Sequence, residues 1–399
     1  MMGDKMPEGD TDLLAGLRAQ VSASLKGFTA ERPPSLPGAL TFSYRPETAR
    51  FPVPELVLYL FRDIMGWTYF GPWEKVRWTV IGAVDGQPIA FELRKFGFTI
   101  SRPPDRPDLD QRIEGQLIDA LKRVERHLAP VARAQVANGE VLVINRFYEF
   151  DERYRFLRDL ADRAYLAGSD PPQTSVDETS NEPVQDQLNR ITSGWNSRTT
   201  SRRHGFFLSS AMIDAWFSCL EHRLALLRAF TGRPIAEGEL LAFLTAKWDE
   251  KLKAVLSKPL PREAGLLLGR LRVVKERIRN PLAHGGVEND LGSLFFYLPN
   301  IGSVPANFSG HGKSARFSIL PVGPRDHDEI CELFDAVDQL LSTGELSAPN
   351  QILQGGVDPA FDASSLEGYA DAIAGDTDHV EAFVDAWSNS WELHVNMDY

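Results

Sequence analysis

One stretch of the chain combines residue types and spacing that suit acid–base chemistry on a phosphate. It reads Arg277-Ile278-Arg279-Asn280-Pro281-Leu282-Ala283-His284-Gly285-Gly286. A histidine side chain titrates near neutral pH, so His284 is suited to take or give a proton. Arg279 stays positively charged and makes forked hydrogen bonds to phosphate oxygens. The pair predicts cleavage of an RNA phosphodiester with no metal and no cofactor, because the attacking 2′-hydroxyl belongs to the substrate.

The local geometry must bring these two side chains together. In a regular α-helix, residues five apart point in directions that differ by roughly 140°. Pro281 changes this expectation, because it cannot donate to the carbonyl of Arg277 and it disfavours helical geometry at Asn280. We expect the helix to kink or restart there, with Asn280 as the cap of the new turn. Such a turn can bring the guanidinium and the imidazole to one concave surface.

The spacing alone is weakly specific. Arg277 with His284, and Arg198 with His204, satisfy looser versions of it. In the alternative interpretation the motif does no chemistry. His284 then caps a helix C-terminus, where a cation is favourable, and Arg279 forms a surface ion pair.

Residues 206–345 are expected to position the motif as an antiparallel four-helix bundle. Apolar residues recur at helical spacing in four segments, 210–230, 238–257, 261–279 and 328–341. The motif closes the third of these. Between the third and fourth segments, residues 294–298 and 316–320 are expected to pair as a small β-hairpin.

The motif and its place in the bundle resemble the HEPN superfamily (higher eukaryotes and prokaryotes nucleotide-binding) over about residues 206–343. The likeness is to members with an Arg-Asn-x-x-Ala-His motif, which Arg279, Asn280 and His284 match. It implies a ribonuclease of toxin or phage-defence systems, a homodimer with paired motifs, and a 2′,3′-cyclic phosphate product. Glu221 resembles an acidic position of some members and is expected to support the site.

The chain differs from some members of the superfamily at one position, and the resemblance leaves a second function open. Some toxin members carry a tyrosine two residues after the histidine, where this chain has Gly286. Non-catalytic members also exist, so the alternative function is a nucleotide-binding or protein-binding dimerisation module.

Residues 1–166 are expected to form an α+β domain that senses a ligand or partner, or restrains the bundle. Helical spacing appears at 12–26, 54–65, 108–128 and 147–166, and β-rich runs at 75–84 and 87–101 flank Asp85-Gly86. Asp-Gly between such runs predicts a hairpin with a type I′ turn. Its apolar face is expected to hold Trp78, Val80, Phe91, Leu93, Phe96 and Phe98. Asp85, Glu92 and Lys95 resemble a metal-dependent nuclease core, but a hairpin explains them fully.

Residues 167–205 are rich in Ser, Thr, Asn, Asp and Pro, which predicts a flexible polar linker. Arg198, Arg202 and Arg203 crowd its end and are candidates for contacts with the RNA backbone. The alternative is a solvated basic junction.

The net charge of −12 is unevenly distributed. Residues 326–399 hold 17 acidic residues and no Lys or Arg, so residues 1–325 carry a net charge of +5. The acidic segment 346–399 is expected either to aid solubility or to cover the basic site. Two cysteines, Cys219 and Cys331, fit buried thiols better than a disulfide framework. The start of the chain lacks a signal-peptide layout and no long apolar run occurs, so a cytoplasmic protein without membrane contact is expected.

Overall fold

The structure, a computed structural model, describes residues 10–30, 42–169, 183–236, 238–256, 262–280, 294–309, 314–316, 322–375 and 377–396. The chain forms two compact units, Met1–Asn138 with Asp385–Tyr399, and Gly139–Val384. The first joins helices to an antiparallel sheet, and the second is mainly helical. The predicted order of an α+β part followed by a helical part is therefore confirmed. Over the described ranges, no helix has the length and apolarity that crossing a bilayer requires.

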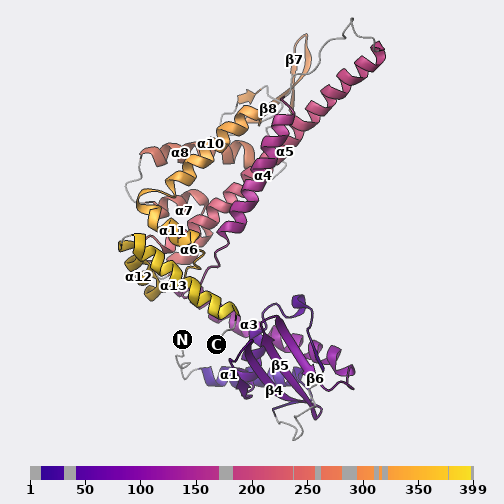
Figure 1. Ribbon diagram of the computed structural model, residues 1–399, viewed down its shortest axis with the longest axis vertical. Coiled ribbons are helices and arrows are strands. Elements are labelled where there is room, and N and C mark those ends of the chain that lie inside the picture. The colour runs from indigo at the N-terminus through magenta and orange to yellow at the C-terminus, as the bar shows by residue number, and fades with distance from the viewer. Residues whose placement is uncertain are drawn as a thin grey trace. The chain divides into compact units, whose positions relative to one another are not determined.

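The sheet of the first unit is antiparallel and has the order β1-β4-β5-β6-β2, with β3 paired to β4 (Figure 1). Its strands are β1 (Phe28–Thr29), β2 (Phe42–Tyr44), β3 (Tyr69–Phe70), β4 (Val76–Val84), β5 (Gln87–Arg94) and β6 (Gly97–Arg102). Asp85 and Gly86 join β4 to β5 with φ of 48° and 75°, the positive values that a type I′ turn requires. The predicted hairpin is confirmed.

Helices supply the other half of the core of this unit. They are α1 (Asp10–Ser24), a 3-10 turn (Thr48–Arg50), α2 (Glu55–Tyr59), a π-helical turn (Leu60–Ile64) and α3 (Asp108–Asn138). Phe61 of the π-helical turn stacks on Phe91 of β5, with ring centroids 4.9 Å apart. The run predicted as one strand over 87–101 is two strands, because the chain turns at Lys95 and Phe96. Phe96 is consequently 73% exposed and does not join the apolar face predicted for it.

The second unit contains most of the helices. They are α4 (Phe147–Ala167), α5 (Val184–Ala229), α6 (Glu239–Thr245), α7 (Trp248–Val255), α8 (Arg262–Val274) with a π-helical turn (Lys275–Arg279), α10 (Pro324–Leu340), a 3-10 turn (Gly344–Leu346), α11 (Ser347–Gln354), α12 (Ala363–Ala374) and α13 (Thr377–Asn396). From Asp385 onward, α13 is grouped with the first unit.

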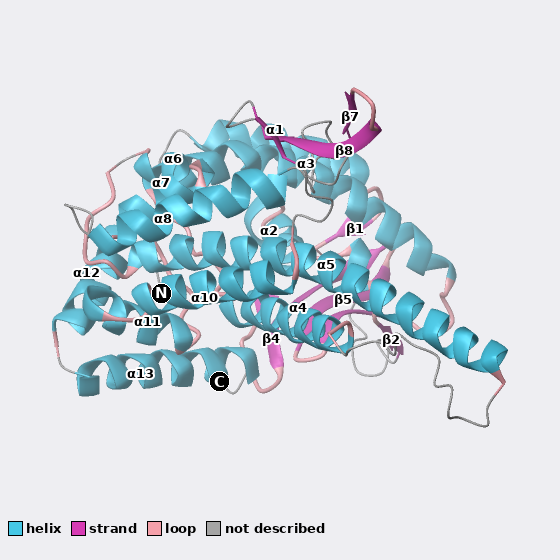
Figure 2. Cartoon of the chain, turned by 90° about the horizontal axis from the view of Figure 1, so that it is seen from above, coloured by secondary structure: helices cyan, strands magenta, loops and turns pink. Residues whose placement is uncertain are grey.

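Helix α5 is the centre of this unit. Trp216 stacks on Phe334 of α10, with centroids 3.8 Å apart and planes 3° apart, and Phe217 packs edge-on against Trp248 of α7 at 5.6 Å. Helix α4 lies along α5 (Figure 1, Figure 2), and a Cβ on Gly205 would lie 2.6 Å from the Tyr165 ring. The predicted domain boundary at residue 166 therefore differs from the structure, in which α4 belongs to the helical unit.

The segment predicted as a flexible linker, 167–205, is helical from Val184 and forms the first half of α5. Its polar composition did not prevent helix formation, and two of its hydroxyl groups bond to carbonyls of the helix itself. Thr192 donates to the carbonyl of Leu188 and Thr199 to that of Trp195, both at 2.9 Å. This half of α5 extends past the end of α4 (Figure 1).

Two predicted elements differ from the structure in detail. The helix expected over 238–257 is broken into α6 and α7, because Ala246 and Lys247 are extended with ψ of 157° and 153°. The strand β7 (Leu294–Leu298) pairs with β8 (Gly302–Ser309), which in turn pairs with β9 (Ser314–Arg316). Of the run 316–320 that was predicted to pair with 294–298, only Arg316 is described, and it pairs with Asn307 of β8; residues 317–320 lie outside the described residues.

The acidic segment 346–399 is not a detached tail. Ile352 and Leu353 of α11 have no exposed surface, and Asn350 accepts a hydrogen bond of 2.7 Å from Arg223 of α5. Tyr369 of α12 packs edge-on against Phe230 at 4.9 Å. The first part of the segment therefore completes the core of the helical unit.

We predict that Leu353→Ala lowers the free energy of unfolding by about 2–5 kcal/mol, because it leaves a cavity in this core. Urea titration measures the loss. Leu393→Ala, at a position in α13 that is 57% exposed, is the control and should change stability by less than about 0.5 kcal/mol. Equal, small effects would show that the segment does not belong to the core.

Candidate functional site

The helix that leads into the motif changes its geometry just before Arg279. Regular α-helix ends at Val274, and residues Lys275–Arg279 form a π-helical turn. The N–H of Asn280 donates to the carbonyl of Lys275, and Asn280 itself has helical angles of φ −64° and ψ −46°. The break expected at Asn280 is not found there, because Asn280 has helical angles and continues the helix; the distortion that the structure shows is the π-helical turn before it. A restart of the helix after Pro281 would lie outside the described residues.

The π-helical turn faces α5 through two ion pairs. Arg279 Nε donates to Asp214 Oδ1 at 2.7 Å, and Lys275 Nζ lies 3.4 Å from Glu221 Oε1. The two acids are two turns apart on α5, and the two bases are one turn apart. The Arg279 side chain remains 32% exposed, so this ion pair does not enclose it completely. Glu221, predicted to support the site, contacts Lys275 and not Arg279.

Asp214 and Lys275 are members of this site that the sequence analysis missed. The signal was present in the spacing, since Asp214 and Glu221 are seven residues apart and so lie on one face of a helix. Lys275 lies over the rings of Phe217 and Trp248, at 5.3 and 5.5 Å from their centroids. Burial lowers the pKa of Lys275, and the carboxylate of Glu221 opposes this shift.

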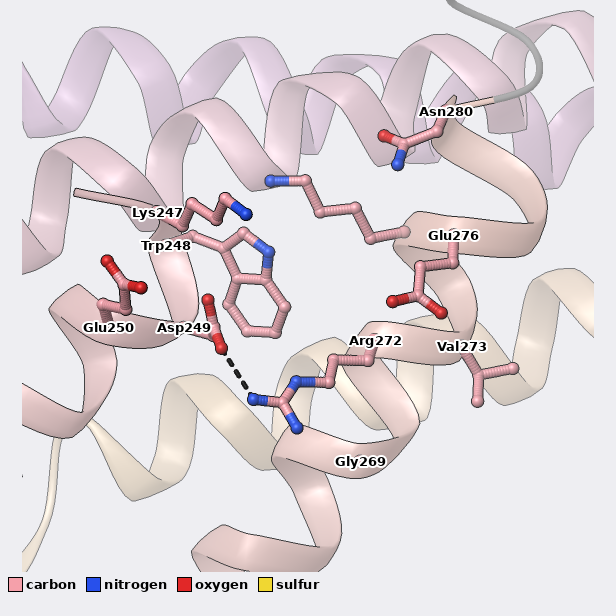
Figure 3. A pocket seen from close by; sticks show the side chains of 10 residues that line it. Lys247, Trp248, Asp249, Glu250, Gly269, Arg272, Val273, Glu276 and Asn280 are labelled. Carbon is pink, nitrogen blue, oxygen red and sulfur yellow. Dashed lines mark hydrogen bonds and ion pairs between the residues drawn. The ribbon is translucent and has the colours of Figure 1, made fainter. Parts of the chain in front are cut away.

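A pocket with a volume of 720 Å³ opens beside this turn, between α7 and α8. Figure 3 shows Trp248 and Asp249 on one wall and Arg272 on the other, where Arg272 reaches across to Asp249 at 2.6 Å. Asn280 also lines this pocket. Its charged lining residues are three cations (Lys247, Arg272 and Lys275) and three anions (Asp249, Glu250 and Glu276), so their charges balance.

The partner that the motif requires, His284, lies outside the described residues. Arg279 and Asn280 are described, and they occupy the last turn of the helix before it. The predicted convergence of Arg279 and His284 on one surface therefore remains a prediction.

The basic cluster at residues 198–203 has a structural partner. Arg198 and Arg202 donate from Nε to the carbonyl of Gly168, at 3.4 and 3.2 Å, at the C-terminus of α4. A cation at this end of a helix is favourable. Arg203 is exposed. Two of the three arginines predicted to bind RNA thus hold α4 to α5.

Two other clusters of polar side chains are weaker candidates for a functional site. Ser209 Oγ lies 2.8 Å from His327 Nδ1, and Asp162 Oδ1 lies 2.9 Å from Nε2 of the same ring. Ser209 has no exposed surface, so this buried group of three side chains cannot present the Ser209 hydroxyl to a substrate. On the hairpin, Glu92 accepts from Thr79 at 3.1 Å and Asp85 from Arg112. No group of three metal-ligating side chains occurs among the residues that the structure describes.

Comparison of the chain with models of known protein families, with curated proteins and with solved structures found no match.

The neighbour of Glu221, His222, is a structural histidine. Its Nε2 accepts a hydrogen bond of 3.0 Å from the backbone N–H of Arg146, and its ring packs on Phe150 at 5.0 Å. Burial lowers the pKa of His222 below its ordinary value of 6.5, and the positive charge of Arg146 lowers it further. Only the neutral ring has a lone pair free to accept this bond.

We predict that His222 makes the fold less stable as the pH falls below about 6.5. In that range the unfolded chain binds the proton more readily than the folded chain, so the free energy of unfolding decreases. His222→Gln keeps an acceptor without a titrating group and should reduce this loss in urea titrations between pH 7.5 and pH 5. His204→Gln on the same helix is the matched control. An unchanged pH dependence in His222→Gln would contradict the assignment.

Proposed function

We propose that this chain is a metal-independent endoribonuclease of the HEPN type that acts as a toxin or defence effector. The observation that carries the proposal is the position of Arg279. It lies on a distorted last turn of its helix, one residue before Asn280, with its guanidinium held at 2.7 Å by Asp214 of the neighbouring helix. A held but partly exposed guanidinium can meet a phosphate with little reorganisation.

In the proposed reaction the ribose 2′-hydroxyl attacks the adjacent phosphorus and the bond to the 5′ oxygen breaks. A 2′,3′-cyclic phosphate remains on one product. His284 removes the proton of the 2′-hydroxyl or protonates the leaving 5′ oxygen, and Arg279 stabilises the charge that builds on the phosphate. A two-fold homodimer would let each motif complete the site of the other.

Neighbouring groups support anion binding at this turn. Lys275 and Arg272 lie on the same helix, and Asn280 lines the 720 Å³ pocket with them. The acids of the pocket offset their charge, so specific contacts and not a broad positive field would hold RNA here.

The ion pairs of Arg279 and Lys275 favour a second function. Arg279 and Lys275 both have carboxylate partners on α5, as expected if the motif only fastens one helix to another. The chain would then be a non-catalytic module that binds a nucleotide or protein and dimerises through its helices.

We predict that the purified chain cleaves RNA in the presence of EDTA. Arg279→Ala and His284→Ala should each reduce the rate by at least about 100-fold, because each removes a group that acts on the transition state. RNA fragments with cyclic phosphate ends are the measurement.

Arg270→Ala is the matched control, because Arg270 is exposed on the same helix, and it should cleave at the wild-type rate. Undiminished cleavage by both motif variants would refute the ribonuclease. Absence of cleavage by the wild type, together with nucleotide binding in calorimetry, would favour the module.

A further inference from the structure

A second cavity lies inside the helical unit, away from the motif. It has a volume of 230 Å³ and lies between α4, α5 and the end of α10. Three buried aromatic side chains line it, Phe147, Tyr154 and Trp216, which are 7%, 2% and 2% exposed. A cavity of this size with aromatic walls suits a small, partly apolar molecule.

The charged groups of this cavity are balanced but unequally exposed. Asp151 and Asp338 have side chains that are 19% and 35% exposed, whereas Arg155 is 71% exposed. Arg155 donates from Nε to Asp151 at 2.6 Å. The carboxylates therefore lie deeper than the guanidinium of Arg155, which is at the rim with its terminal N–H groups available.

The fourth charged group, Arg223, forms the floor of the cavity. Its side chain is 5% exposed and donates to Asp338 at 3.2 Å, to Ser342 at 2.8 Å and to Asn350 at 2.7 Å. Its Nε has no partner among the described residues. The Nε of Arg223 thus remains a buried donor, and the carboxylates of Asp151 and Asp338 are the negatively charged acceptors of the lining.

The geometry points to a binding site for a small zwitterion of the α-amino acid class with an apolar side chain. Its ammonium group would lie between Asp151 and Asp338, its carboxylate would bond to Arg155 at the rim, and its side chain would pack on the aromatic walls. A zwitterion matches the net zero charge of the lining residues. These charges are already paired with one another, so a simple cation or a simple anion would add an uncompensated charge to the lining, and a zwitterion would not.

The electrostatics of Asp338 agree with this assignment. Burial raises the pKa of Asp338 to about 6, against the opposing effect of Arg223. Like-charge repulsion from Asp151 and Asp335 makes a smaller contribution to the same rise. An ammonium group at this place would relieve part of the cost of keeping the carboxylate ionised.

Isothermal titration calorimetry on the full chain with leucine as the probe tests the proposal. Leucinamide keeps the ammonium group without the carboxylate, as an N-terminal peptide residue would, and N-acetylleucine keeps only the carboxylate. Leucine should bind at one site per chain, about tenfold or more tighter than either analogue. No saturable binding of leucine, or equal binding of leucinamide, would overturn the assignment.

Asp151→Asn should weaken leucine binding by about tenfold or more. Asp159→Asn is the matched control, because Asp159 forms the same i,i+4 pair with Arg163 on α4 and does not line the cavity. Arg155→Gln repeats the test, with Arg163→Gln as its control. These two side chains are 71% and 72% exposed, so neither substitution should affect the stability of the fold much. Binding that is equal in variants and controls would also overturn the proposal.

Discussion

The stack of Trp216 on Phe334 is the contact on which the helical unit depends. It joins α5 to α10 at 3.8 Å and so sets the rotation of α5 about its own axis. With that rotation set, Asp214 and Glu221 face the π-helical turn, and Arg223 faces Asp338 and Asn350. The ion pairs of the π-helical turn and the lining of the aromatic cavity therefore both depend on how this one buried contact orients α5.

The π-helical turn has a similar importance for the motif. It turns Lys275 and Arg279 toward α5, where each meets a carboxylate. This arrangement serves both proposed functions, because a positioned guanidinium can bind a phosphate or simply fasten two helices. The difference between them lies in whether an imidazole meets the same phosphate.

Sequence patterns were most informative where a local physical rule applied. Asp85-Gly86 predicted its turn because few residue types accept positive φ. The reduced thiols of Cys219 and Cys331 followed from their apolar neighbours, and both are buried.

Patterns failed where tertiary contacts decided the outcome. Residues 184–205 looked like a linker, yet they continue a helix that the packing of Trp216 and Gly205 holds in place. Arg198 and Arg202 looked like phosphate ligands, yet they bond to the carbonyl of Gly168. The partner of Arg279 could not be assigned, because Asp214 and Glu221 share a face and only the helix offset selects between them.

The close approach of α4 to α5 limits how the chain can vary. A methyl group at position 205 would meet the Tyr165 ring at 2.6 Å, and the hydroxyl of Tyr165 donates to the carbonyl of Val322 just before α10. Even alanine at this position would have to push the two helices apart and disturb that hydrogen bond. Position 205 is thus intolerant of every side chain, although it lies in a stretch that looks freely replaceable.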